Sequence, residues 1–233
     1  MLILGIDSSA VSVSAAVCDG FTVIAEGFIN NRITHSQTLM PLTEAILKNA
    51  GLTLADIDAF AVSAGPGSFT GLRIGISAVK GMAYALGKPC RAVSTLHAMS
   101  FNMMSWEGIV CAAMDARRSQ VYNALFEVKD GKVTRLTEDR AISTDELKAE
   151  LDSKYADRKI ILVGDGAELC CRNFGDSANI TVASGLQRYQ NGTGVCFAAQ
   201  FCEDISPAAL MPSYLRLSQA ERERENKQGS AQV

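Results

Sequence analysis

Two short turns carry the residues of this chain that could bind a phosphate. Asp7-Ser8-Ser9 follows an apolar run, and a second turn, Gly65-Pro66-Gly67-Ser68-Phe69-Thr70, joins a predicted strand to a predicted helix. Small residues let backbone N–H groups approach an anion closely, and a helix start presents N–H groups that have no partner within the helix. Arg73, about one turn into that helix, is the nearest cation. An anion could therefore contact Asp7, Ser8, Ser9, Gly67, Ser68 and Arg73.

The glycine turn also has a structural interpretation. No Gly-Lys-Ser/Thr follows Gly65 at the required spacing, so the turn is not a nucleotide-binding P-loop. Turns of this composition also occur where a chain only changes direction. The sequence leaves both interpretations open, anion binding and a structural turn.

Acid–base, metal and nucleophilic chemistry have weaker support. The two histidines, His35 and His97, belong to no H-E-x-x-H or H-x-x-x-H pair. Ser36 follows His35 directly, and adjacent residues on a helix point in different directions, so they form no triad. The seven cysteines are odd in number and form no C-x-x-C motif. We therefore expect no catalytic residue, no metal site and reduced thiols.

Composition limits the size of the core and the kind of partner. With 233 residues, 48% hydrophobic and 20% charged, the chain can bury one large core or two smaller lobes. The net charge of −3 argues against a protein that wraps nucleic acid alone, because neutralising phosphates requires a basic face. An RNA partner would be held jointly with another chain. The sequence has no basic leader and no apolar run of about 18 residues, so we expect a cytoplasmic protein without membrane association.

The order of predicted elements repeats along the chain. In the first half, three Val- and Ile-rich runs predict an antiparallel meander, which is followed by a helix, a strand and a second helix. These elements span residues 2–7, 11–18, 21–29, 34–50, 57–64 and 71–86. After a connecting helix around 94–104, the same order recurs at 108–114, 119–128, 131–137, 144–154, 159–163 and from 166 onward.

A βββαβα unit used twice is similar to the actin, sugar kinase and Hsp70 (ASKHA) class of α/β folds, in which two lobes face each other across a nucleotide-binding cleft. We place an N-terminal lobe at residues 1–104, a C-terminal lobe at 105–217 and a solvated tail at 218–233. Asp115-Ala116-Arg117-Arg118 then occupies the hairpin turn equivalent to Asp7-Ser8-Ser9. Its two arginines replace the glycine of that class, and they could meet an anion or a partner's carboxylate.

The two helices of the first lobe have more apolar surface than one buried stripe requires. Small residues recur at helical spacing along helix 71–86, although each interior glycine costs about 1 kcal/mol relative to alanine. A closely packed neighbouring helix would offset that cost. Helix 34–50 has two apolar rows, of which one can face its own lobe and the other a partner, with ordinary packing inside the lobe as the alternative. The predicted partner interface comprises Leu39, Met40, Leu42, Ile46, Leu47, Gly71, Gly75, Ala78, Met82 and Ala85.

Several motifs together resemble the bacterial TsaB (YeaZ) family, in the right order and through nearly the whole chain. They are Leu2-Ile3-Leu4-Gly5-Ile6-Asp7-Ser8-Ser9, His35-Ser36, the stretch from Gly65 to Gly75, Ser94-Thr95-Leu96, Met114-Asp115-Ala116-Arg117-Arg118 with Val121-Tyr122, Gly164-Asp165-Gly166 and Pro212-Ser213-Tyr214-Leu215-Arg216.

The resemblance implies a non-catalytic supporting role. Together with the transferase TsaD and the ATPase TsaE, members of the family serve to place a threonylcarbamoyl group on the adenosine beside the tRNA anticodon. TsaD carries a metal-binding histidine pair in the stretch that corresponds here to residues 94–99, where His97 is the sole histidine. The family also pairs through the first two helices of its N-terminal lobe, with TsaD or with a second copy. These properties imply no cofactor of the chain's own, ATP handled by partners, tRNA contact only within the complex, and a homodimer when the chain is alone.

The rival interpretation is an enzyme of the same fold. Such an enzyme would hydrolyse a nucleotide or transfer a phosphoryl group, using Asp7 and the glycine turn. The sequence leaves open whether the chain binds a nucleotide in its own cleft.

Overall fold

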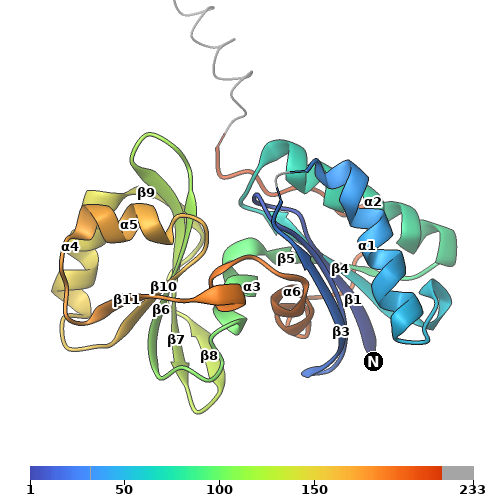
Figure 1. Cartoon of the computed structure of the whole chain (residues 1–233), viewed down its shortest axis with the longest axis horizontal. Helices are drawn as coiled ribbons and strands as arrows, with labels where there is room; N and C mark the ends of the chain where they lie inside the picture. Colours follow the sequence, from blue (N-terminus) through green and yellow to red (C-terminus); the bar gives the residue numbers. More distant parts are fainter. Residues whose placement is uncertain (32, 217–233) are drawn as a thin grey trace, which may run out of the picture.

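The first lobe is built on a five-stranded sheet with the strand order β3-β2-β1-β4-β5 (Figure 1). The structure, a computed structural model, describes residues 1–31 and 33–216. The predicted meander is confirmed, because β1 pairs antiparallel with β2 and β2 with β3, while β4 and β5 add in parallel beyond β1. These strands are β1 (Leu2–Asp7), β2 (Val13–Asp19), β3 (Thr22–Ile29), β4 (Ala59–Gly65) and β5 (Cys90–Ser94).

The second lobe repeats this plan in a sheet with the order β11-β10-β6-β7-β8. Its meander is antiparallel, and β10 and β11 add in parallel beside β6, while the extra strand β9 pairs with β7. The duplicated unit and the two-lobed, ASKHA-like α/β class are therefore confirmed. The strands are β6 (Gly108–Asp115), β7 (Gln120–Lys129), β8 (Lys132–Arg135), β9 (Arg140–Ser143), β10 (Ile160–Val163) and β11 (Ile180–Val182).

Helices cover the outer face of each sheet and fill the space between the sheets (Figure 1). In the first lobe α1 packs on β2 and β3, and α2 packs on β4; α4 and α5 cover the second sheet, and α3 and α6 contact each other between the lobes. Within the two described ranges, none of the helices has the length and apolar character that a membrane span requires. The helices are α1 (His35–Asn49), α2 (Phe69–Leu86), α3 (Thr95–Phe101), α4 (Thr144–Lys154), α5 (Ala167–Phe174) and α6 (Gly192–Ala199), with 3-10 turns at Leu54–Asp56 and Gly185–Arg188.

The sequence prediction missed four short elements, β5, β9, β11 and α6. β5 and β11 each pair in parallel with the preceding strand across an intervening helix, so no hairpin signal marks them. α6 also changes the predicted lobe boundary, because this helix packs on β1 and β2 of the first sheet and Ile205 then pairs with Cys90 of β5. The chain after α6 therefore belongs to the first lobe and not, as predicted, to a second lobe that continues to residue 217. The predicted tail at 218–233 lies outside the described residues.

His97 joins α3 to the second sheet. Its ring stacks on Phe126 of β7 with 5.5 Å between centroids, and Phe101 flanks it at 5.1 Å. Burial, helped by the nearby Arg135 guanidinium, lowers the pKa of His97 to about 4. The imidazole is therefore neutral in the folded chain over a pH range in which an unfolded chain would be protonated.

We predict that acidification destabilises the fold partly through His97. Between its ordinary pKa of 6.5 and its folded pKa of about 4, the unfolded chain binds a proton that the folded chain does not, so the free energy of unfolding falls as the pH falls. His97→Phe keeps a flat ring on Phe126 but cannot titrate. Urea unfolding at neutral pH and inside this window should show a smaller loss of stability for the variant than for the parent chain. Equal losses would contradict this role of His97.

Candidate partner-binding face

The first turn is buried and its carboxylate is fully engaged by the chain itself. Asp7 accepts hydrogen bonds from the Ser9 amide and the Ser9 hydroxyl, each at 2.9 Å, and from the Ser63 hydroxyl. Burial raises the pKa of Asp7, and these hydrogen bonds partly oppose that rise. A carboxylate held in this way has no free oxygen directed at a substrate.

The glycine turn packs directly against the first turn. The Ser68 amide donates to the Ser9 carbonyl at 2.7 Å, and the Ser68 hydroxyl caps α2 by accepting a hydrogen bond from the Gly71 amide at 3.3 Å. Of the six predicted anion contacts, five meet here, and Arg73 is instead bonded to Tyr214. The amides of Ser9, Ser68 and Gly71 are therefore used within the chain, which supports the structural interpretation of the turn.

Carboxylates from both lobes face this region. Gln190 donates to Asp165 of the Gly164-Asp165-Gly166 turn at 2.8 Å. Burial raises the pKa of Asp165, and the charges of Asp115 and Asp7 raise it further. The described part of the chain contains no cluster of three or more His, Cys, Asp or Glu side chains suited to a metal ion. Acidic groups of both lobes therefore lie near one another, and burial disfavours the charged forms of Asp7 and Asp165.

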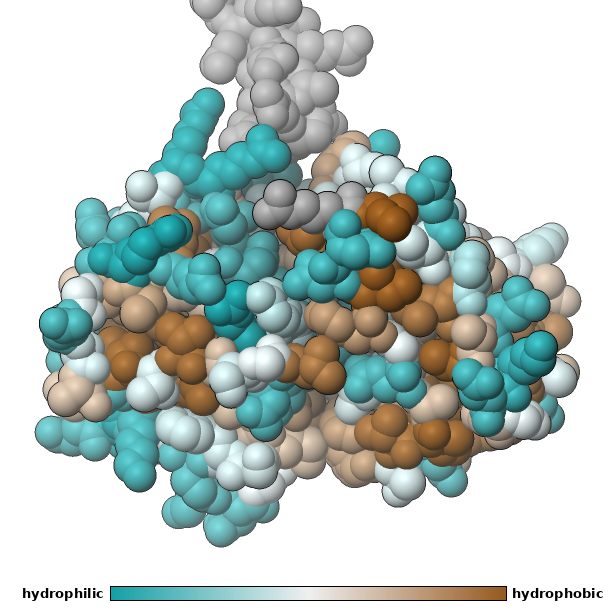
Figure 2. Space-filling model, in the orientation of Figure 1, coloured by the Kyte–Doolittle hydropathy of each residue, from teal (hydrophilic) through white to brown (hydrophobic). Residues whose placement is uncertain are grey.

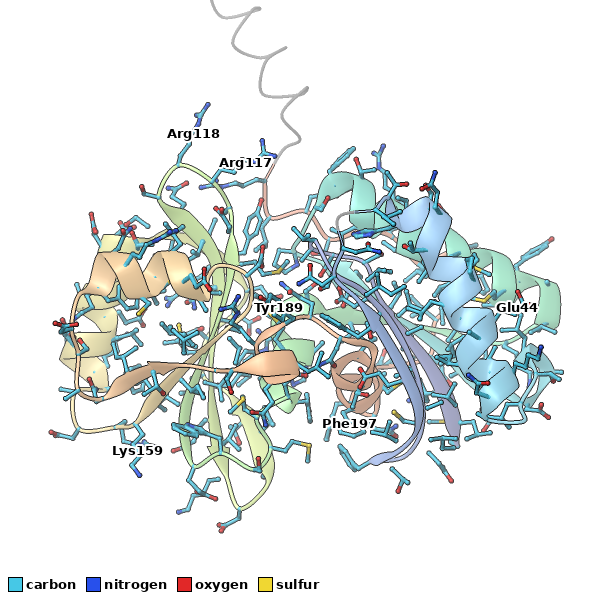
Figure 3. The ribbon with its side chains drawn as sticks, viewed as in Figure 1. Glu44, Arg117, Arg118, Lys159, Tyr189 and Phe197 are labelled. Atoms are coloured by element: carbon cyan, nitrogen blue, oxygen red, sulfur yellow. The ribbon has the colours of Figure 1, made fainter. Side chains whose placement is uncertain are left out.

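The second hairpin turn carries its two arginines in a strained conformation. Arg117, Arg118 and Ser119 have φ angles of 64°, 55° and 56°, a region that costs non-glycine residues about 1–2 kcal/mol each. The Asp115 carboxylate accepts a hydrogen bond from the Arg117 amide at 2.7 Å. Figure 3 places both arginine side chains at the tip of this turn, at one end of the molecule. Their contact with an anion or a partner's carboxylate stays a prediction.

The small-residue stripe of α2 faces its own lobe. A Cβ atom at Gly71 would lie 2.1 Å from the Ser8 carbonyl oxygen, and one at Gly75 would lie 2.4 Å from the Ser8 hydroxyl oxygen. The close neighbour that offsets the cost of these glycines is therefore the first turn and not a partner helix. The prediction that Gly71 and Gly75 belong to a partner interface is wrong for this reason.

The remaining predicted interface residues divide between core and surface. Four of them lie in the core beneath the helices with exposed fractions of 7% or less: Leu39, Ile46, Leu47 and Met82. The other four reach the outer surface to different degrees, with Leu42 and Ala78 half-buried and Met40 and Ala85 exposed. Met40 is a large apolar side chain that is 43% exposed, so it is the most prominent apolar residue of this group.

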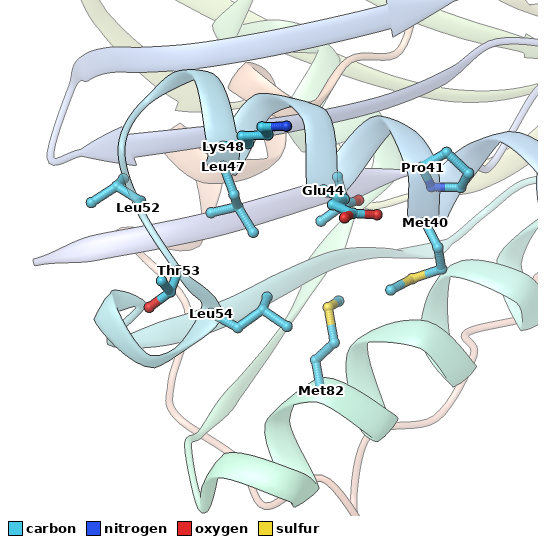
Figure 4. Close-up of a pocket in the computed structure, with 10 residues that line it drawn as sticks. Met40, Pro41, Glu44, Leu47, Lys48, Leu52, Thr53, Leu54 and Met82 are labelled. Atoms are coloured by element: carbon cyan, nitrogen blue, oxygen red, sulfur yellow. The ribbon is translucent and has the colours of Figure 1, made fainter.

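Two hollows adjoin Met40 on the outer face of α1 and α2. The first hollow, of about 590 Å³, lies between the helices, and Figure 4 shows Met40 and Met82 pointing toward one another across it. The second hollow, of about 560 Å³, lies toward the start of α2 and is lined by Met40, Phe69, Arg73, Ile74 and Ala78, among others. Figure 2 shows apolar patches over the first lobe that are separated by hydrophilic side chains. We call the outer surface of α1 and α2 around these hollows the helical face.

Comparisons with known sequences relate the chain to a TsaD family model and to TsaB proteins. The family model described as "TsaD: tRNA N6-adenosine threonylcarbamoyltransferase" matches residues 24–222. The tRNA threonylcarbamoyladenosine biosynthesis protein TsaB of Bacillus subtilis (strain 168) is 30% identical over 223 residues, which cover 95% of this chain and 96% of that protein. The chain belongs to the TsaB family. The TsaB protein of Escherichia coli (strain K12) is 36% identical over 152 residues, or 64% of this chain and 65% of that protein.

Solved structures extend the agreement to the fold. A Pseudomonas aeruginosa protein described as similar to peptidase YEAZ has a TM-score of 0.78 at 25% identity, covering 92% of this chain and 99% of its own. YeaZ from the same organism has a TM-score of 0.77 at 24% identity with the same coverage. The ethanolamine utilization protein EutJ of Carboxydothermus hydrogenoformans shares the fold alone, with a TM-score of 0.54 at 13% identity over 85% of this chain and 90% of that one. The resemblance to TsaB (YeaZ) drawn from the motifs is confirmed.

We predict opposite effects on stability for two glycines of α2. Gly71→Ala would force a methyl group against the Ser8 carbonyl and should lower the free energy of unfolding by about 1–3 kcal/mol. Gly81→Ala is the matched control, because no atom lies within 4 Å of a Cβ there, and it should raise stability by about 1 kcal/mol through helix propensity. Urea unfolding measures both. Equal tolerance of alanine at the two positions would show that α2 does not rest on the first turn as described.

We predict that the charge of Asp7 is dispensable for folding. Because burial raises the pKa of this carboxyl above its ordinary 3.8, its ionisation costs stability as the pH rises from there toward neutrality. Asp7→Asn keeps an acceptor for the Ser9 amide and stays neutral, so it should be at least as stable as the parent chain at pH 7, with an advantage that shrinks on acidification. The measurement is urea unfolding across this pH range. A loss of more than about 2 kcal/mol at neutral pH would mean that the fold needs the carboxylate.

Proposed function

We propose that this TsaB-family chain is a non-catalytic subunit that binds a TsaD partner through its helical face and so supports threonylcarbamoyl transfer to the adenosine beside the tRNA anticodon. The relatives in Bacillus subtilis and Escherichia coli are named for tRNA threonylcarbamoyladenosine biosynthesis, which supports a role in that pathway. The observation that carries the proposal is the exposed Met40 beside two apolar hollows on one outer face. In the cell this role belongs to the cytoplasm.

The chemistry of the helical face fits a protein partner. Apolar side chains line both hollows together with charged residues, Glu44 and Lys48 in the first hollow and Arg73 in the second. A mixture of apolar and charged side chains is typical of protein interfaces that form and separate in water. The same face would pair with a second copy of the chain when TsaD is absent, because a two-fold dimer uses one patch on both subunits.

The first turn and the glycine turn support the non-catalytic part of the proposal. Asp7 accepts a hydrogen bond from the Ser9 amide, and the Ser9 carbonyl accepts one from the Ser68 amide. Burial, and then the nearby charges of Asp115 and Asp7, raise the pKa of Asp165. Under this proposal the chain has no cofactor of its own, ATP is handled by TsaD and TsaE, and tRNA is contacted only within the complex. The net charge of −3 fits that division of roles.

We predict that Met40→Glu breaks the complex with TsaD. The substitution puts a charge at the centre of the helical face, where binding would remove it from water, so the affinity should fall by about tenfold or more. Leu186→Glu is the matched control, because Leu186 is also an exposed apolar residue, at 56%, but lies in the Gly185–Arg188 turn. Titration calorimetry with purified TsaD measures both affinities.

Two outcomes would contradict the proposal. Equal binding by both variants would show that the helical face does not contact TsaD. Nucleotide hydrolysis or phosphoryl transfer by the purified chain alone would favour the rival enzyme and would remove the non-catalytic role.

A further inference from the structure

The last described residues of the chain run back along α2 and cross from the first lobe to the second. Lys80 of α2 donates to the Leu210 carbonyl at 3.1 Å, and the Ser213 amide donates to the Ala64 carbonyl in β4 at 2.7 Å. Three residues later, Arg216 donates to the Ala116 carbonyl in the turn between β6 and β7 at 3.2 Å. Its guanidinium also lies 6.0 Å from the centroid of the Tyr122 ring. Residues 213–216 therefore span the two lobes.

Tyr214 attaches this segment to the helical face. Its ring stacks on Phe69 with 4.7 Å between centroids and 24° between planes, and its hydroxyl accepts a hydrogen bond from Arg73 Nε at 3.0 Å. The Arg73 guanidinium in turn lies 3.8 Å from the centroid of the Phe69 ring. Phe69 and Arg73 both line the second hollow. Tyr214 thus holds two residues of the helical face in one arrangement.

Gly65 permits the path of the segment. Its φ angle is +140°, and a Cβ atom there would lie 2.1 Å from the Ser213 carbonyl oxygen. Both the backbone conformation and the close approach of Ser213 exclude a side chain at this position. The start of the glycine turn therefore also provides the place where residues 213–216 rest on β4.

We infer that residues 213–216 are a clamp that fixes the Phe69 and Arg73 end of the helical face and ties it to the second lobe. The inference rests on the proposed function in one respect, that this face binds the partner. Tyr214 acts as a positioning residue through Phe69 and Arg73. A side chain already held in one rotamer loses less entropy on binding, so the clamp favours partner association.

Hydrogen exchange of the full chain without any partner tests the clamp itself. Tyr214→Ala removes the aromatic pair and should speed exchange about three- to tenfold both at residues 69–73 and in the turn at 115–120. Tyr214→Phe keeps the stack and should affect only residues 69–73, while Arg216→Ala should affect only the turn. Met211→Ala, at a 65% exposed position just before the clamp, is the control and should change neither region. A response to Tyr214→Ala confined to residues 211–216 would overturn the clamp.

Affinity for TsaD tests the role of the clamp in binding. Tyr214→Ala should weaken the complex about three- to tenfold, and Met211→Ala should not. Faster exchange in Tyr214→Ala together with unchanged TsaD affinity would overturn the link between the clamp and binding. Failure of the parent chain to bind TsaD would defeat the proposed function, and the exchange experiment would still decide whether the clamp exists.

Discussion

Ser8 packs so closely against the first turns of α2 that the helix residues facing it are glycines. Gly71 and Gly75 both face it, and the adjoining Ser9 carbonyl accepts a hydrogen bond from the Ser68 amide. This contact uses the Ser68 amide and the Ser9 carbonyl, and it packs the glycine turn directly against the first turn. It also seats α2 with Gly71 and Gly75 toward Ser8, while the hollows beside Met40 lie on the outer side of the helix. The close packing of the two turns and the orientation of α2 thus have a common cause.

The two lobes share a topology but differ in what their outer helices offer. The helical face of the first lobe has apolar hollows, whereas α4 of the second lobe carries two ion pairs, Lys148 with Asp152 and Lys154 with Glu150. Exposed ion pairs of this kind add little stability, but they keep a surface hydrated. A duplicated fold has therefore become asymmetric, with one lobe suited to bind a protein. The tie from Tyr214 to Arg216 joins these unequal halves at one end of the molecule.

Local patterns in the sequence predicted the antiparallel meanders, the long helices and the duplication, because each of these depends on a period of apolar residues within one segment. They missed β5 and α6, since β5 is a short edge strand that pairs in parallel with β4 across a helix, and α6 is largely apolar and has no amphipathic period. Helical spacing correctly grouped Gly71 and Gly75 on one side of α2, but spacing does not say what that side meets. Met40 could be placed at the surface only once the row of α1 that faces the sheet was known. The role of Tyr214 depends on a contact with Phe69 across 145 positions of the chain, which no local pattern records.

The central claim is that the helical face acts by being buried against a TsaD partner. Hydroxyl-radical footprinting of the full chain, with and without TsaD, measures this directly through the oxidation of methionines. Met40 and Met211 are exposed at 43% and 65%, so both should be oxidised in the free chain at a concentration low enough to keep it monomeric. On addition of TsaD, the account predicts strong protection of Met40 and continued oxidation of Met211. A stable complex in which Met40 is oxidised as fast as in the free chain would contradict it.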